Sequence, residues 1–90
     1  MTPQKAKALI GFKKTKSLME KIIQMVETDQ YCINVMQQNL AAIGLLRSAH
    51  EMLMAGHLQS CFKMAFSTKN TAKQQQMTDE ILKVTKLFNK

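Results

Sequence analysis

The chain has 90 residues and a mass of 10.2 kDa, the size of one small domain. Two cysteines are too few for a disulfide-rich scaffold, and no apolar run approaches the ~20 residues of a membrane-spanning helix. Thirteen Lys and Arg against six Asp and Glu give a net charge of +7, which favours a polyanion, either nucleic acid or a membrane surface. Because no signal peptide is recognisable, we expect a cytoplasmic protein.

The first predicted element is a helix over about residues 3–28. Thr2 followed by Pro3 is a start signal, because proline is tolerated in the first helical turn. Gly11 within this helix costs about 1 kcal/mol relative to alanine. Apolar residues recur at the three- and four-residue steps of one helix face. This stripe consists of Leu9, Phe12, Thr15, Met19, Ile22 and Val26, widened by Leu18, Ile23 and Met25.

A second helix is predicted over about residues 30–66, after a short polar break in which Asp29 is the expected N-cap. Its apolar stripe consists of Ile33, Met36, Leu40, Ile43, Leu46, Leu53 and Met54. A helix of roughly 35 residues is ~50 Å long at 1.5 Å per residue. One chain of 90 residues cannot cover such a stripe, so the length predicts an oligomer.

The third helix is predicted over about residues 72–89, and Thr71 and Gln74 are predicted to form a capping box at its start. No internal repeat and no linker divides the chain. We therefore expect residues 1–90 to form a single all-α domain, a three-helix protomer with a very long second helix. The apolar stripes left over predict a homo-oligomeric bundle.

Cys32, His57 and Cys61 are the candidate metal ligands. His57 and Cys61 stand four residues apart on a predicted helix and so share one face. Thiolate and imidazole suit Cu(I), Zn(II) and Ni(II). Cys32 lies about 38 Å from His57 along a straight helix, so it could join the pair only across a subunit boundary. The pattern alone also fits a buried structural cysteine and a solvent-facing histidine.

Three segments resemble the CsoR/RcnR/FrmR family of bacterial metal- and stress-sensing repressors. Residues 29–33, read as Asp-Gln-Tyr-Cys-Ile, resemble that family's D-x-Y-C-I segment. Residues 56–61, Gly-His-Leu-Gln-Ser-Cys, resemble its D/N-H-L-x-x-C segment. Residues 79–81, Asp-Glu-Ile, resemble its D-E-L segment, and the separation of the first two segments matches as well.

This resemblance implies an all-helical dimer of dimers that binds operator DNA when it carries no metal. It implies a Cu(I) site in which Cys32 of one protomer joins His57 and Cys61 of its neighbour, with Tyr31 and Glu80 near the ligands. Nickel- and cobalt-responding members add an N-terminal histidine and usually replace the second cysteine. This chain has no histidine before residue 50 and keeps Cys61, which favours copper over nickel or cobalt. The expected metal is therefore Cu(I), and Zn or Ni remain the alternatives.

The DNA-contacting arginines of the family are not retained. The family's R-x-x-G-Q segment corresponds to residues 14–18, Lys-Thr-Lys-Ser-Leu, and its A-V-R segment lacks the arginine after Ala42-Ile43. Lysines can replace part of this contact, although a lysine run is as often a solvated helix face. The candidate DNA-binding residues are Lys5, Lys7, Lys13, Lys14, Lys16 and Arg47.

The leading hypothesis is a Cu(I)-responsive repressor that releases operator DNA when metal binds. One alternative is a thiol sensor in which Cys32 and Cys61 of different subunits are bridged on oxidation or persulfidation. A second is a helical metal-binding module that has lost DNA binding. Catalysis is not expected, because no acidic residue is clearly placed to orient His57.

Overall fold

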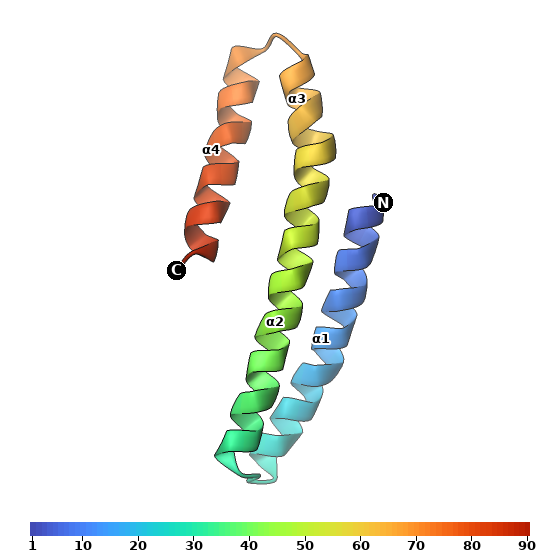
Figure 1. Cartoon of the computed structure of the whole chain (residues 1–90), viewed down its shortest axis with the longest axis vertical. Coiled ribbons are helices and arrows are strands. Elements are labelled where there is room, and N and C mark those ends of the chain that lie inside the picture. Colours follow the sequence, from blue (N-terminus) through green and yellow to red (C-terminus); the bar gives the residue numbers. More distant parts are fainter. The chain divides into compact units, whose positions relative to one another are not determined.

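The computed structural model describes residues 1–90 and contains helices and no strand (Figure 1), which confirms the all-α prediction. Residues 32–67 are helical throughout, as predicted for a very long second helix. The chain divides into two compact units, residues 1–56 and residues 57–90; that the whole chain is one domain stays a prediction. None of the helices combines the length and the apolar character that a membrane span requires. The elements are α1 (Pro3–Glu27), α2 (Cys32–His57), the π-helix η1 (Leu58–Phe62), α3 (Lys63–Ser67) and α4 (Thr71–Phe88).

The start of α1 follows the sequence signal. The Thr2 side chain accepts a hydrogen bond from the backbone N–H of Lys5 at 3.1 Å, and Pro3 occupies the first helical position. The threonine thus satisfies one of the N–H groups that have no partner within the helix.

Asp29 ends α1 and does not cap α2, which corrects the prediction. Its φ of 55° lies in the left-handed region. The N–H of Asp29 donates to the carbonyl of Val26 at 3.0 Å, and the N–H of Gln30 donates to that of Met25 at 2.9 Å. This pair of bonds is a Schellman motif, which stops a helix with a left-handed residue. The motif places two residues, Gln30 and Tyr31, between Asp29 and the start of α2.

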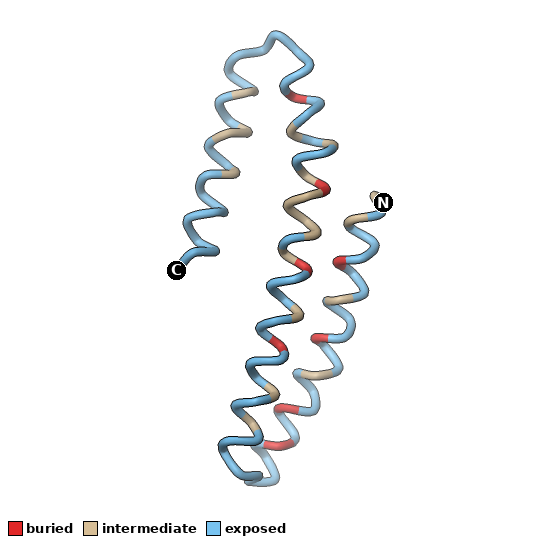
Figure 2. Tube along the Cα trace, viewed as in Figure 1, coloured by how far each residue is buried: buried red, intermediate tan, exposed pale blue.

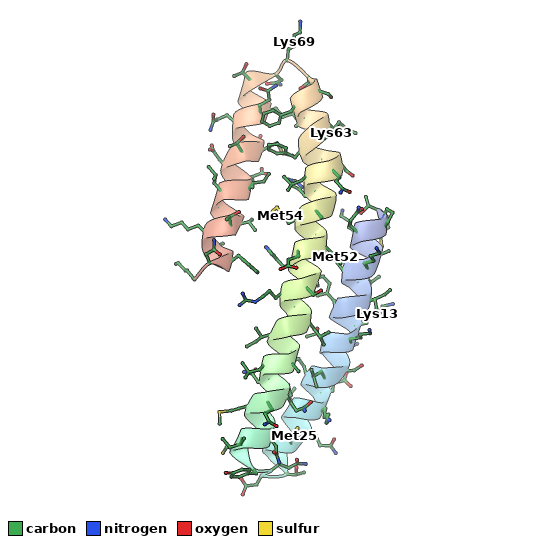
Figure 3. All side chains as sticks on the ribbon, viewed as in Figure 1. Lys13, Met25, Met52, Met54, Lys63 and Lys69 are labelled. Atoms are coloured by element: carbon green, nitrogen blue, oxygen red, sulfur yellow. The ribbon has the colours of Figure 1, made fainter.

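Unit 1 is an antiparallel pair formed by α1 and α2 up to Gly56 (Figure 1). On both helices the more buried residues alternate in steps of three and four, the seven-residue repeat of a helix–helix seam. Figure 2 shows the buried positions of the two helices facing each other, and Figure 3 places Met25 and Met52 between them. The seam residues are Ala8, Gly11, Thr15, Leu18, Ile22 and Met25 on α1, and Val35, Gln38, Ala42, Leu45, Ala49, Met52 and Gly56 on α2.

Small residues let the two helices of the seam approach closely. A Cβ built on Gly11 would lie 3.5 Å from the Cβ of Ala49. The buried Thr15 hydroxyl donates to the Gly11 carbonyl at 2.8 Å, so its burial leaves no unsatisfied polar group. Gly11 lowers the stability of α1 relative to alanine, but a large side chain at this position would prevent the close contact with Ala49.

The predicted apolar stripes lie largely outside this seam. Thr15, Leu18, Ile22 and Met25 belong to it, but no member of the stripe predicted on α2 does. Most of the stripe residues that are not in the seam lie one or four residues after a seam residue. In an antiparallel helix pair, residues at these offsets on both helices lie on the same side of the seam. We call this exposed surface the apolar side. It consists of Leu9, Phe12, Met19, Ile23 and Val26 on α1 and Met36, Ile43 and Leu46 on α2, with Ile33 and Leu40 at its edge.

Unit 2 contains η1, α3 and α4, and α3 contacts both of the other elements. The rings of Phe62 and Phe66 stack with centroids 4.4 Å apart, and Ala65 is buried. Asn70 caps α4 by accepting from the N–H of Lys73 at 3.1 Å, so the predicted capping box at Thr71 is wrong.

Candidate functional site

Cys32 is the first residue of α2, and its thiol is exposed and free. The carbonyl of the preceding residue, Tyr31, accepts from the N–H groups of Asn34 at 3.0 Å and Val35 at 3.3 Å, so α2 begins directly after Tyr31. The tyrosine side chain is 70% exposed. Both side chains are therefore accessible to a partner.

His57 ends α2, and Cys61 lies within the π-helix that follows. His57 is partly buried, whereas the thiol of Cys61 is exposed and free. A π-helix bonds residues five apart and so widens the turn, which keeps residues four apart about one turn from each other. Helical segments of this kind occur frequently at functional sites. From the sequence, residues 30–66 were predicted to form one helix, and this π-helical segment was not predicted.

The chain alone assembles no group of three His, Cys, Asp or Glu side chains that could hold a metal ion. Cys32 and His57 lie at opposite ends of α2. Cys32 lies three residues before the seam residue Val35, the same offset that Leu46 of the apolar side has from Ala49. His57 lies one residue after the seam residue Gly56, the same offset that Ile43 of the apolar side has from Ala42. By this repeat both candidate ligands are at apolar-side positions of α2.

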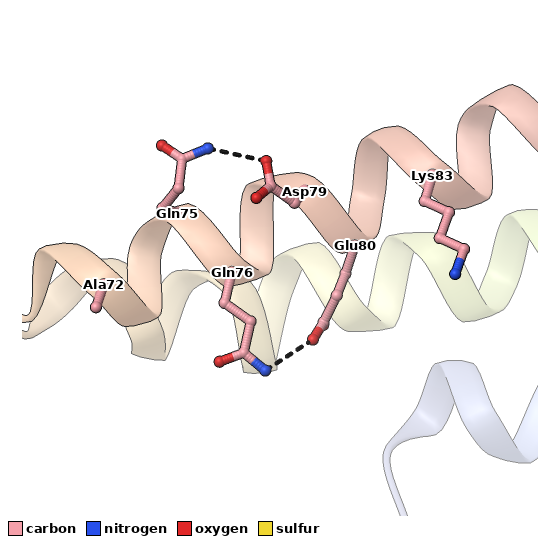
Figure 4. Close-up of a pocket in the computed structure, with 6 residues that line it drawn as sticks. All are labelled: Ala72, Gln75, Gln76, Asp79, Glu80 and Lys83. Atoms are coloured by element: carbon pink, nitrogen blue, oxygen red, sulfur yellow. Dashed lines mark hydrogen bonds between the residues drawn. The ribbon is translucent and has the colours of Figure 1, made fainter.

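Glu80 and its neighbour Asp79 are on α4 and are exposed. The Glu80 carboxylate accepts from the Gln76 amide at 3.2 Å, and that of Asp79 accepts from the Gln75 amide at 2.8 Å (Figure 4). These bonds join residues one turn apart on the same helix, with Ala72 and Lys83 lining the same open surface. The role of Tyr31 and Glu80 beside a metal stays a prediction.

The candidate DNA-binding residues are all exposed, but they do not share one surface. Lys13 points away from α2 (Figure 3). Lys5 lies seven residues before Phe12, and Lys16 lies seven residues after Leu9. Because seven residues are about two helical turns, both lysines lie on the apolar side. The other three are Lys7 and Lys14 on the opposite side of the seam and Arg47 on α2.

One close approach near the candidate ligands was also missed from the sequence. A Cβ on Gly56 would lie 2.9 Å from the Cβ of Gln4, so the first turn of α1 packs directly on Gly56. The available signal was the seven-residue spacing of Ala42, Ala49 and Gly56, which marks a line of small residues along one helix. For the π-helix we find no comparable signal in the sequence.

Residues 4–87 match the family model described as metal-sensitive transcriptional repressor. The chain is 35% identical over 65 residues to the copper-sensing transcriptional repressor CsoR of Mycobacterium ulcerans (strain Agy99), covering 72% of this chain and 56% of that protein. It is 34% identical over 65 residues to the proteins of the same name from Mycobacterium bovis (strain BCG / Pasteur 1173P2) and Mycobacterium tuberculosis (strain ATCC 25618 / H37Rv), covering 72% of this chain and 55% of each. The match thus spans little more than half the length of these relatives.

Proposed function

Because this chain belongs to the family of metal-sensitive transcriptional repressors, we propose that it is a Cu(I)-responsive repressor of transcription. The observation that carries the proposal is the exposure of two free thiols within this family's sequence framework. The names of the mycobacterial relatives support copper as the metal. The protein is then a regulator and not an enzyme.

The proposed metal ligands are Cys32 of one protomer and His57 and Cys61 of another. Two thiolates and one imidazole form a soft donor set that suits Cu(I), with Zn(II) and Ni(II) as weaker candidates. A second copy is needed, because the ligands are at both ends of α2. The exposed apolar side, to which two of the ligand positions belong, supports a homodimer or homotetramer as the assembled form.

Metal binding would regulate DNA binding through the assembly. Without metal the basic protein holds operator DNA, whose phosphates attract the net charge of +7 per chain. Cu(I) lowers the affinity only if it binds the DNA-free arrangement more tightly than the DNA-bound one. A coupling free energy of about 1–3 kcal/mol corresponds to a 5–150-fold loss of DNA affinity.

Anaerobic titration with Cu(I), followed calorimetrically, tests the ligand set. We expect Cys32→Ala, His57→Ala and Cys61→Ala each to lose tight binding. His50→Ala is the matched control, because His50 lies seven residues before His57 on the same face of α2. Tight Cu(I) binding that survives Cys32→Ala would overturn the proposed ligands.

A gel-shift titration with duplex DNA from upstream of the protein's own coding sequence tests the regulatory step. We expect a complex that dissociates when Cu(I) is added, and no such response in the Cys32→Ala variant. Cu(I) binding without any DNA complex would indicate the second alternative, a helical metal-binding module.

The free thiols also favour a second candidate function, a thiol sensor. Cys32 of one subunit and Cys61 of another would form a disulfide by giving two electrons and two protons to hydrogen peroxide, which becomes two waters. Mass spectrometry under denaturing, non-reducing conditions would then detect a covalent dimer after peroxide treatment. A monomer mass under all conditions removes this candidate.

A further inference from the structure

Three lysines of α1 form a single line along the helix. Lys7, Lys14 and Lys21 are spaced by seven residues, which is two helical turns, and all three are exposed. Steps of seven residues at 1.5 Å each place successive Cα atoms about 10 Å apart, so the line is about 21 Å long. We call these three residues the lysine line. Each precedes a seam residue, which puts the line on the side of the seam opposite the apolar side.

Small neutral residues of α2 flank the lysine line. The approach of Gly11 to Ala49 and of Gln4 to Gly56 fixes the antiparallel register of the two helices. Like the three lysines, the α2 residues beside them in this register each directly precede a seam residue. These flanking residues are Ala55, Ser48 and Ala41. None of these three carries a charge or a long side chain, which leaves room for a large partner beside the three ammonium groups. The exposed Glu51, which precedes the seam residue Met52, lies on the same side of the seam.

The carboxylates of α1 lie on a different line of the helix. Glu20 and Glu27 share the seven-residue repeat of Lys13, which points away from α2 in Figure 3. That outer line therefore carries one positive and two negative charges, whereas the lysine line carries three positive charges. On α2, Glu51 is the only carboxylate. The side of the seam with the lysine line therefore has three positive charges and the one negative charge of Glu51.

We propose that Lys7, Lys14 and Lys21 are the phosphate-contacting surface of the protein and bind the backbone of duplex DNA. This inference rests on the proposed function and assigns its DNA contact to one flank of unit 1. A line of about 21 Å runs along roughly six base pairs, at 3.4 Å per phosphate on each strand. Lysine suits this contact, because its ammonium binds phosphate as a point charge on a flexible stem. The contact fixes position without reading sequence.

Salt dependence of DNA binding tests the lysine line. The probe is a mixed-sequence duplex of about 30 base pairs, since phosphate contacts do not require an operator. We compare the full-length K7Q/K14Q/K21Q variant with K5Q/K13Q/K16Q, which removes the same charge from other lines of the same helix. Fluorescence anisotropy between about 50 and 200 mM salt gives the slope of log affinity against log salt.

We expect the K7Q/K14Q/K21Q variant to lose about 2.7 units of this slope per bound protomer, at about 0.9 per phosphate. The control should retain most of its slope, and K7R/K14R/K21R should bind like the wild type because the charges remain. Circular dichroism and the Cu(I) titration verify that each variant folds. Equal weakening of the two glutamine variants would overturn the lysine line while leaving the proposed function intact. Failure of the wild type to bind duplex DNA would overturn both.

Discussion

Replacing Gly56 with alanine tests the close packing of α1 on α2. The added Cβ would lie 2.9 Å from the Cβ of Gln4, closer than such atoms approach in proteins. Because a Cβ is fixed to the backbone, the first turn of α1 must move to make room. Gly44 is the matched control, since a Cβ there meets no atom within 4 Å and no glycine of the chain has a positive φ.

Two opposing contributions set the magnitude. Alanine in place of glycine within a helix stabilises by about 1 kcal/mol, and both variants gain this. Overpacking costs about 1–3 kcal/mol and applies to Gly56→Ala alone. We therefore expect Gly44→Ala to stabilise the protein by about 1 kcal/mol and Gly56→Ala to be neutral or destabilised by up to about 2 kcal/mol. The difference between the two variants isolates the packing contribution.

Thermal unfolding followed by circular dichroism measures this difference. A change of 1 kcal/mol shifts Tm by about 4–8 °C for a chain of this size, so the two variants should differ by at least about 4 °C. All proteins are compared at one concentration, because assembly makes Tm depend on concentration. A Gly56→Ala variant as stable as Gly44→Ala would refute the close approach of Gln4 to Gly56.

Two further predictions concern helix capping and assembly. Asn70→Ala should destabilise α4 by about 1 kcal/mol, as measured by urea unfolding, because the side-chain cap is lost. Thr71→Ala should cost less than Asn70→Ala, and the reverse order would restore the predicted capping box. Ile43→Asp on the apolar side should weaken assembly about a hundredfold or more in sedimentation, since each copy loses about 1.5–3 kcal/mol of burial. Gln37→Asp adds the same charge elsewhere on α2, and equal dissociation by both variants would contradict the assignment of the apolar side.

Helix positions could be predicted from the sequence because they depend on local chemistry. Thr2 and Pro3 start α1 where predicted, since a cap and a proline act within one turn. Asp29 was correctly predicted to lie in the break between the first two helices, but it ends α1 and does not cap α2. An aspartate can either cap a following helix or adopt a left-handed conformation that ends the preceding one, and the sequence does not distinguish these.

The candidate ligands were also found from the sequence, because residue type and spacing indicate which chemistry is available. The path of the chain places Cys32 at the start of α2 and His57 at its end, as the predicted helix requires. The π-helix around Cys61 was not predicted. Its hydrogen bonds differ from those of an α-helix by one residue, which leaves the apolar period almost unchanged.

By itself, the sequence determined three helical segments, their approximate bounds, the excess of positive charge and the three candidate metal ligands. Only the tertiary structure decided which helix face meets which partner. Periodicity ranks faces by hydrophobicity, so it selected the stripe of large apolar residues. The α1–α2 seam instead uses Ala42, Ala49 and Gly56, because small side chains let two backbones approach closely. Packing through these small residues leaves the apolar side exposed. It also places Lys7 and Lys14 on a different side of the seam from Lys5 and Lys16, although all four were predicted together as DNA-binding residues.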